Sequence, residues 1–326
     1  MLDVRRLRLL RELSLRGTIA AVAEALAYTP SAVSQQLSTL EREAGVPLLE
    51  RTGRRVRLTP AGQKLVAHAE AVLERLEQAA GELAASCHEV AGRVRIGIFP
   101  TAARALLPDA LTSLAGRHPA LEPMVSEIDP ADVAPALRAG ELDVALVHEY
   151  DFVPSPVEPG LATEPLCDET MYLAATTLPH VDLADGAAAL GHWRDAAWIT
   201  ATPGTLCHTM TLRACHGAGF TPHVRHQVDE FATVLELVAA GHGVAMVPQL
   251  AVTDAPPNLS LVRLPLHRRT LIAVRSGAGA HPAVAAVAAA LRAAVRRIGD
   301  PPARRCGGCG RADTRPHPRA TEVCAS

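Results

Sequence analysis

Cysteine and histidine are the residue types in this chain that could support redox or metal chemistry. Cys207 and Cys215 lie eight residues apart. On one helix they would be about 12 Å apart along its axis, beyond the reach of a disulfide bond unless the helix unfolds. The histidines of the same region are His208, His216, His223 and His226. Solvated side chains account for these histidines better than a metal site does.

The C-terminal segment carries the other possible ligand set. Cys306 and Cys309 form a lone CxxC, with His317 and Cys324 downstream. A single CxxC is weak evidence for a metal site, and the Pro-, Gly- and Arg-rich composition of residues 299–326 is typical of a disordered tail. The sequence therefore predicts no metal and no cofactor.

Catalytic motifs are also missing from the sequence. It contains no Gly-x-Ser-x-Gly, no His-Glu-x-x-His, no phosphate-binding loop and no glycine fingerprint after a predicted strand. We therefore predict that the protein is not an enzyme.

Composition describes a folded chain. Of its 326 residues, 48% are hydrophobic and 20% are charged, which predicts about two domains and excludes disorder for most of the chain. No apolar run approaches the ~18 residues of a membrane span, and charges interrupt the N-terminal stretch where a secretory signal would be apolar. The seven cysteines are odd in number and scattered, as reduced thiols are. We predict a cytoplasmic protein.

The charge is distributed unevenly. Residues 1–60 hold ten arginines and six acidic residues, a net charge of +4, whereas the whole chain has a net charge of −2. A basic module joined to a larger acidic one indicates a polyanionic partner for the first and a different partner for the second.

The basic end has the pattern of a helix-turn-helix. Apolar spacing and caps predict helices over 7–16, 19–26 and 30–44. The third presents short hydroxyl and amide side chains on its polar surface, at Ser31, Ser34, Gln35, Gln36, Ser38 and Thr39. Such side chains can contact phosphates and read base edges in a major groove.

A basic hairpin follows the third helix. Gly53 supports a turn between two short extended runs. The arginines around this turn are Arg51, Arg54, Arg55 and Arg57. This pattern predicts a β-wing that contacts DNA phosphates.

Residues 7–62 resemble the winged helix-turn-helix of LysR-type transcriptional regulators. The resemblance is carried by Ala20-Ala21, Ser31-Ala-Val-Ser-Gln-Gln-Leu37, Leu40-Glu41, Gly45-Val-Pro-Leu-Leu-Glu-Arg51 and Leu58-Thr-Pro-Ala-Gly62. The DNA-facing positions that it implies are Thr29, Pro30, Ser31, Ser34 and Gln35. The family often has Gln-Pro at positions 30–31 and Arg at position 35, and Gln35 could pair with adenine instead.

Residues 61–88 form a predicted long helix with a heptad seam. Its apolar positions are Leu65, Ala69, Val72, Leu76, Ala79 and Leu83. This stripe could pack against the chain's own C-terminal domain or against a second copy. The resemblance implies an antiparallel pairing of two such helices, hence a homodimer that assembles further to a tetramer.

The remaining chain alternates strands and helices. Strands are predicted over 93–99, 121–128, 142–147, 170–175, 197–200, 243–248 and 270–274, and helices over 102–115, 131–139, 229–240 and 282–298. Residues 91–298 resemble the two-lobed effector-binding domain of the same family, built like type 2 periplasmic solute-binding proteins. The implied division is a head over 1–60, a linker helix over 61–89 and an effector domain over 90–298. Within the effector domain, lobe I comprises 91–162 and 268–298, and lobe II comprises 163–267.

The ends of these strands give the candidate effector pocket. Thr101 stands at a helix N-terminus that would accept an anion. With the positions implied by the family, the candidates are Phe99, Pro100, Thr101, Asp129, Pro130, His148, Thr200, Thr202, Thr205 and Phe231. Some relatives have Arg where His148 stands, so the charge of this pocket could depend on pH.

These observations predict a multidomain protein with an all-α winged helix-turn-helix head, a dimerisation helix and a two-lobed α/β effector-binding domain. The implied function is sequence-specific transcriptional regulation controlled by a small molecule. The implied partners are double-stranded DNA, the effector, a second copy of the chain and RNA polymerase. Two alternatives remain: a thiol redox-sensing regulator that uses Cys207 and Cys215, and a solute-binding protein without a DNA role.

Overall fold

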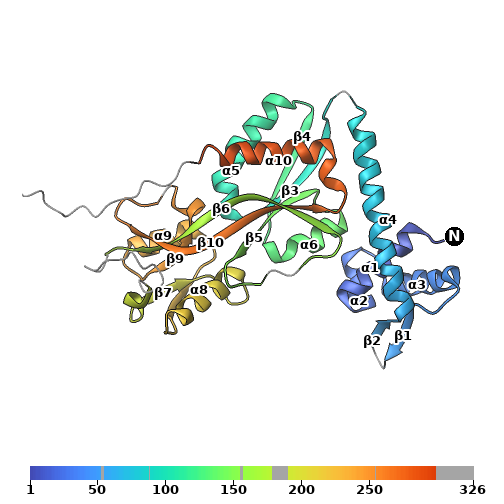
Figure 1. Ribbon diagram of the computed structural model, residues 1–326, viewed down its shortest axis with the longest axis horizontal. Coiled ribbons are helices and arrows are strands. Elements are labelled where there is room, and N and C mark those ends of the chain that lie inside the picture. The colour runs from blue at the N-terminus through green and yellow to red at the C-terminus, as the bar shows by residue number, and fades with distance from the viewer. Residues whose placement is uncertain (53–54, 88, 155–156, 178–189, 254, 299–326) are drawn as a thin grey trace, which may run out of the picture.

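The computed structural model describes residues 1–52, 55–87, 89–154, 157–177, 190–253 and 255–298. The predicted tail with Cys306, Cys309 and Cys324 lies outside the described residues. A small head and a long helix, α4, stand beside a larger α/β body (Figure 1). Among the described helices, none is both long and apolar enough to cross a membrane.

The head consists of three short helices and a β-hairpin. The helices are α1 (Val4–Arg16), α2 (Ile19–Ala25) and α3 (Pro30–Ala44), and strands β1 (Leu49–Thr52) and β2 (Arg55–Leu58) pair antiparallel. Helix α1 begins three residues before the predicted start, because the Asp3 carboxylate accepts hydrogen bonds from the first backbone amides. The buried centre of the head contains Leu10, Val33, Leu37 and Leu40.

Helix α4 (Pro60–Ala85) joins the head to the body and contacts both. Leu65 and Ala69 pack into the core of the head. Farther along, the Glu77 carboxylate accepts a hydrogen bond of 2.6 Å from Arg275 of the body. The apolar stripe on the opposite face stays open, since Val72, Leu76 and Leu83 are 38%, 49% and 74% exposed.

A mixed sheet forms the centre of the body. Among the described strands its order is β4-β3-β5-β10-β6-β9, made of β3 (Gly92–Ile98), β4 (Leu121–Glu127), β5 (Val144–Tyr150), β6 (Leu161–Ala175), β9 (Ala245–Pro248) and β10 (Ser260–Arg275). β3 pairs parallel with β4 and β5, whereas β10 pairs antiparallel with β5 and β6. A smaller parallel pair joins β7 (Ala197–Thr200) and β8 (His223–Gln227).

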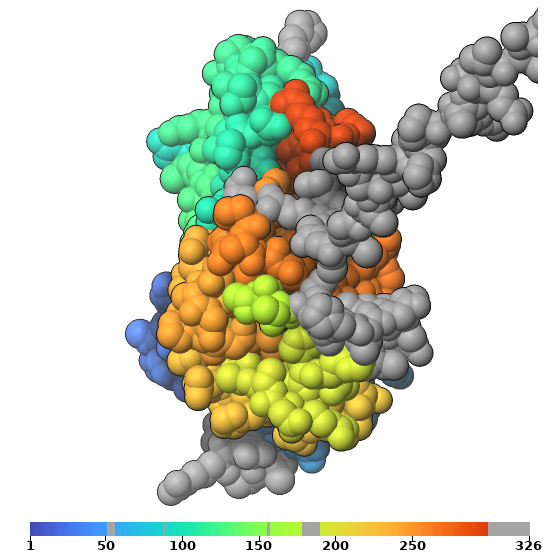
Figure 2. All heavy atoms as spheres, turned by 90° about the vertical axis from the view of Figure 1, so that its left-hand side faces the viewer, coloured from blue at the N-terminus to red at the C-terminus, as the bar shows by residue number. Residues whose placement is uncertain are grey.

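The passage between the two lobes is a pair of long strands. β6 and β10 pair from Ala175 and Ser260 at one end to Leu161 and Arg275 at the other, with register shifts between Arg263 and His267 and between Thr270 and Leu271. The crossings predicted near residues 163 and 267 therefore lie inside continuous strands. Figure 2 shows the first lobe, with α10, stacked on the second.

Helices cover both lobes. The first lobe carries α5 (Pro100–Arg117), α6 (Pro130–Ala139) and α10 (Pro282–Val295), and the second carries α8 (Leu206–Gly217) and α9 (Phe231–Ala239). Short 3₁₀ turns are η1 (Leu190–Trp193), η2 (Gln249–Val252) and η3 (Ala278–Ala280). Each lobe has its own core, around Ile96, Leu106 and Leu291 in the first and around Met210 and Trp198 in the second.

Candidate functional site

The start of α3 presents the predicted base-reading side chains at the surface. Thr29, Pro30, Ser31 and Gln35 are exposed. The Thr29 hydroxyl accepts a hydrogen bond from the amide of Ala32 and so caps the helix. Its oxygen also lies 3.1 Å from the Ser31 hydroxyl. The fixed φ of Pro30 suits the first helical turn, and the exposed side chains leave this end of α3 open to a partner.

Two of the predicted DNA-facing residues lie deeper. Ser34 and Gln36 are half-buried. The Gln36 side-chain oxygen accepts a hydrogen bond of 2.8 Å from the Arg6 guanidinium. Gln36 therefore links α3 to α1. The sequence pattern grouped Gln36 with the DNA-contacting hydroxyl and amide side chains and could not reveal this structural role.

The hairpin after α3 carries the predicted arginines. Arg51 lies on β1, Arg55 and Arg57 lie on β2, and the Arg57 side chain is exposed. Arg54 lies outside the described residues. Glu41 of α3 accepts hydrogen bonds from the amides of Leu48 and Leu49, which attaches the hairpin to the helix.

A cavity of about 1030 Å³ lies between the two lobes of the body. Of the predicted pocket residues, it is lined by Phe99, Pro100, Thr101, Asp129, Pro130, His148, Thr205 and Phe231. In the described part of the chain, helices α5, α6, α8 and α9 all begin at this cavity. The partial positive charge of several helix N-termini is therefore directed toward the same space.

Thr200 and Thr202 are not among the lining residues, which corrects the prediction for these positions. Thr200 is 3% exposed and donates its hydroxyl to the carbonyl of Ala201. The Thr202 hydroxyl lies 2.9 Å from the Asp229 carboxylate, and Asp229 does line the cavity. Thr202 thus positions a lining residue without reaching the space itself.

The N-terminus of α5 differs from the other helix ends at the cavity. Asp129, Thr205 and Glu230 cap α6, α8 and α9 with side-chain hydrogen bonds. At α5 the capping position is Phe99, which makes no such bond within the described structure. The first amides of α5, beside Thr101, are therefore available to an anion.

Arg268 of β10 is a cavity residue that the sequence analysis missed. It is 1% exposed, and its guanidinium makes two hydrogen bonds, of 2.7 and 2.9 Å, to the Glu169 carboxylate of β6. Burial lowers the pKa of Arg268, but its interactions with Glu169 and Tyr150 together more than offset this effect, so the net pKa is raised. The guanidinium carbon also lies 5.1 Å from the centre of the Phe99 ring.

Alternation along β10 was the signal for Arg268. Leu264, Leu266, Arg268 and Thr270 are buried, whereas His267 and Arg269 between them are exposed. Arg268 falls on the same face of the strand as the buried residues. A charged side chain at such a position indicates either a buried ion pair or a contact with a ligand.

His148 is uncharged at neutral pH. Burial, together with the nearby positive charge of Arg268, lowers the pKa of His148 to about 3. Its Nδ1 atom is buried without a hydrogen-bond partner in the described structure. The ring packs edge-on against Phe99 and Tyr150, with centres 4.8 and 5.1 Å apart. The expectation that the pocket changes charge through His148 near neutral pH is therefore wrong.

Cys207 also lines the cavity, whereas Cys215 is buried in the core of the second lobe. Both cysteines lie on α8, so the case considered from the sequence, with the two thiols on one helix, is the one that the structure has. Burial raises the pKa of Cys207 to about 11, despite a hydrogen bond from Tyr150, and raises the pKa of Cys215 to about 12. Neither thiol is ionised at neutral pH.

The histidines of the second lobe do not assemble with other ligands. Across the described residues, no group of three His, Cys, Asp or Glu side chains is arranged to hold a metal ion. The Nδ1 atom of His208 lies 2.9 Å from the carbonyl oxygen of Ala201, and the rings of His226 and His242 pack edge-on 6.0 Å apart.

Comparison with known proteins matches both parts of the chain. The family "Bacterial regulatory helix-turn-helix protein, lysR family" matches residues 4–63, and "LysR substrate binding domain" matches residues 88–296. A probable hydrogen peroxide-inducible genes activator of Streptomyces viridosporus is 32% identical over 283 residues, covering 85% of this chain and 89% of that protein. One from Mycobacterium avium is 33% identical over 252 residues, covering 76% and 77%. The structure of a Corynebacterium glutamicum OxyR C206 mutant has a TM-score of 0.55 and 26% identity, and the match covers 91% of this chain and 93% of that chain.

Proposed function

The chain belongs to the LysR family of bacterial DNA-binding transcriptional regulators, and we propose that a small molecule in the cavity between its lobes controls its binding to DNA. The observation that carries the proposal is the cavity itself, at which several helices begin and the α5 N-terminus lacks a side-chain cap. Members of this family are regulators rather than enzymes, and the chemistry of the cavity is that of a binding site.

The lining favours a small monoanion. The free amides at the start of α5 and the Thr101 hydroxyl suit one carboxylate. Acidic side chains also line the cavity, namely Glu127, Asp129, Asp132, Glu149, Glu158, Asp229 and Glu230. They disfavour a polyanion and suit a ligand that also carries hydrogen-bond donors or a positive charge. Arg268 is already paired with Glu169, so it holds the floor of the cavity in place more than it adds net positive charge.

The regulator would act in the cytoplasm as a homodimer that can assemble to a tetramer. The open stripe of Val72, Leu76 and Leu83 on α4 supports pairing of two such helices. A dimer places two copies of α3 on two half-sites of an inverted repeat. Contact with RNA polymerase would then follow from binding near a promoter.

Binding to DNA tests the first half of the proposal. We would measure salt-dependent binding and footprints of the purified protein on the DNA upstream of its own gene. Gln35→Ala is expected to change sequence preference, because Gln35 is an exposed amide on the base-reading surface. Arg57→Ala is expected to weaken binding to every sequence and to reduce the salt slope by about 1. Equal losses on all sequences for both variants would contradict the assignment of α3.

Ligand binding tests the second half. A set of small carboxylates would be screened by their effect on the melting temperature of the full chain. Thr101→Val is expected to abolish the response to any carboxylate found, because Thr101 stands at the uncapped end of α5. The control is Thr112→Val, an exposed threonine on the same helix that lies off the cavity. An unchanged response in Thr101→Val would place the ligand elsewhere.

A thiol response to peroxide is the second candidate function. It is supported by the names of the two relatives and by the place of Cys207 in the cavity. A disulfide from Cys207 to Cys215 would require α8 to unwind, since both residues lie on that helix. Peroxide should then reduce the helical circular dichroism of the wild type but not of Cys207→Ser or Cys215→Ser. An unchanged footprint of the wild type after peroxide would exclude this candidate.

A further inference from the structure

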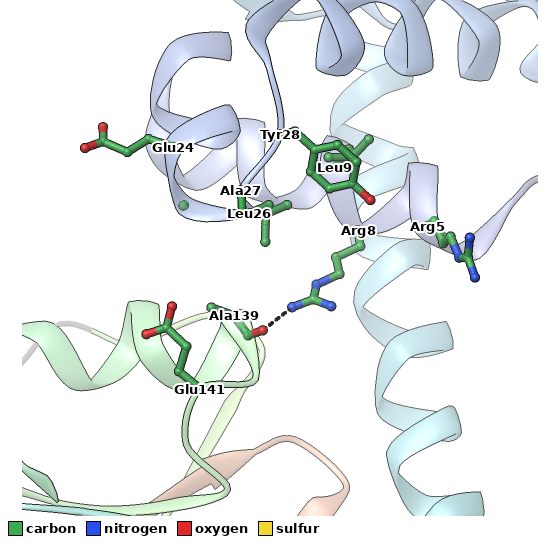
Figure 3. A pocket seen from close by; sticks show the side chains of 10 residues that line it. Arg5, Arg8, Leu9, Glu24, Leu26, Ala27, Tyr28, Ala139 and Glu141 are labelled. Atoms are coloured by element: carbon green, nitrogen blue, oxygen red, sulfur yellow. Dashed lines mark hydrogen bonds between the residues drawn. The ribbon is translucent and has the colours of Figure 1, made fainter.

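A crevice of about 450 Å³ lies where the head meets the body. Figure 3 shows its walls: α1 and the turn after α2 on one side, and the end of α6 with Glu141 after it on the other. The Arg8 guanidinium of α1 crosses the crevice. Its Nη2 atom donates hydrogen bonds of 2.7 Å to the carbonyls of Arg138 and Ala139.

The Arg8 contact falls on the C-terminal end of α6. Arg138 and Ala139 are the last residues of this helix, whose final carbonyls have no partner within the helix. A cation at a helix C-terminus also interacts favourably with the helix dipole. Arg8 therefore supplies, from the head, a cap for a helix of the body.

The other end of α6 forms a wall of the cavity between the lobes. Pro130, Ala131, Val133 and Ala134, in its first turns, are lining residues. At ten residues, α6 is about 15 Å long. Its inward face is buried against Leu142 and the sheet. Pro135 removes one hydrogen bond inside α6, so the packing of this face would have to carry a displacement from the cavity to the docking contact.

A second path runs beside α6. The Arg138 side chain, 7% exposed, donates hydrogen bonds of 3.0 Å to Glu158 and to the carbonyl of Pro159. Glu158 lines the cavity. Gly160, two residues after Glu158, lies directly against the Glu70 side chain of α4. The segment 158–160 thus contacts the cavity, α6 and the linker helix.

We propose that α6 couples the cavity to the DNA-binding head, so that ligand occupancy at its N-terminal end and docking of Arg8 at its C-terminal end influence each other. The proposal rests on the ligand site proposed above. By linkage, a ligand that alters the position of α6 alters the free energy of docking, and docking alters ligand affinity by the same factor. The orientation of the head relative to the body would change with it.

Hydrogen exchange of the full chain, without ligand or DNA, tests the coupling. Arg8→Ala is expected to speed amide exchange about tenfold along α6, including the amide of Ala134 at the cavity. The matched control is Arg5→Ala, which removes the same charge from the same crevice. In the described structure the Arg5 side chain makes no bond to α6. Arg8→Lys keeps a donor for the carbonyls and should restore part of the protection.

The reciprocal variant acts from the cavity. Ala131→Trp places a large side chain at the exposed, cavity-lining start of α6, and it is expected to change exchange in α1 and in residues 25–28 of the head. Thr112→Trp is the control, on an exposed position of α5 away from the cavity. Faster exchange confined to the last turn of α6 in Arg8→Ala, equal effects of Arg5→Ala, or an unchanged head in Ala131→Trp would each overturn the proposal. None of these outcomes depends on whether a natural ligand or operator has been found.

Discussion

The ion pair of Arg268 and Glu169 holds the floor of the cavity together. The two side chains are 1% and 2% exposed, and Glu169 also accepts hydrogen bonds from the Thr270 hydroxyl and the Leu250 amide. Removing one member of a buried pair leaves an uncompensated charge. We expect Glu169→Gln to lower the free energy of unfolding by about 3–5 kcal/mol in denaturant titrations.

Glu164→Gln is the matched control for this prediction. Glu164 lies on the same strand and pairs with Arg292 at the surface, where the two side chains are 50% and 37% exposed. We expect this substitution to change the free energy of unfolding by less than about 1 kcal/mol. Similar losses in both variants would mean that burial does not set the strength of the Arg268 pair.

His148 gives the stability of the protein a dependence on pH. Its pKa is about 3 in the folded state, against an ordinary value of 6.5 for histidine. Below pH 6.5 the unfolded chain takes up a proton that the folded chain does not, so the free energy of unfolding falls as pH falls toward 3. The contribution is up to about 1.4 kcal/mol per pH unit. His148→Phe should flatten this slope, whereas His223→Asn, at an exposed position, should leave it unchanged.

The positions of the site residues were predictable where a local rule fixes them. Thr101 stands at the start of a helix that follows a strand, a pattern visible in the sequence. Thr205, which caps α8, was placed in the pocket only by the family resemblance, because no helix over 206–217 was predicted. Arg268 was missed because its partner, Glu169, lies on another strand, and the register of β10 on β6 is what brings the two residues together. Thr200 was assigned to the cavity because it ends a predicted strand. Its position in the sequence does not show whether the side chain faces the cavity or the core.

At the scale of elements, α4 divides its surface between the chain and a second copy. Glu77 and Gly81 face the body, whereas Val72, Leu76 and Leu83 form the open stripe. Leu76→Glu is expected to convert the proposed dimer to a monomer in sedimentation experiments, because it places a charge in an apolar helix pair.

The control for the stripe is Ala71→Glu. Ala71 is exposed on the same helix and lies about 120° around it from the centre of the stripe. It should leave the dimer intact. A dimer that survives Leu76→Glu would show that the stripe is not the interface.

Elements with a complete local pattern were predicted closely, and long strands were not. Helix α3 begins at Pro30 and ends at Ala44 as expected, because Thr29 and Gly45 cap its two ends. In β6, only 170–175 was predicted, since most of the stretch from Leu161 to Asp168 is exposed and lacks alternation. In β10, Pro265 and the charges at 267–269 hid the first half, which is set by pairing with β6.

At the scale of the whole molecule, the body holds α4 at the turn that carries Gly277. This residue has φ +88°, and a Cβ there would collide with the backbone carbonyl of Glu74 on α4. Gly277→Ala should cost about 1–2 kcal/mol for the left-handed backbone and should also push α4 away from the body. Calorimetry should then show the head and α4 unfolding separately from the body.

Gly279→Ala, in the same turn, is the control. A Cβ at Gly279 meets only Val274, at 3.9 Å, and the φ of Gly279 is ordinary, so this variant should keep the wild-type transition. If both variants unfold as the wild type does, the contact between Gly277 and Glu74 does not couple the two parts, and the head would be held to the body by Arg8 and the bonds around α6.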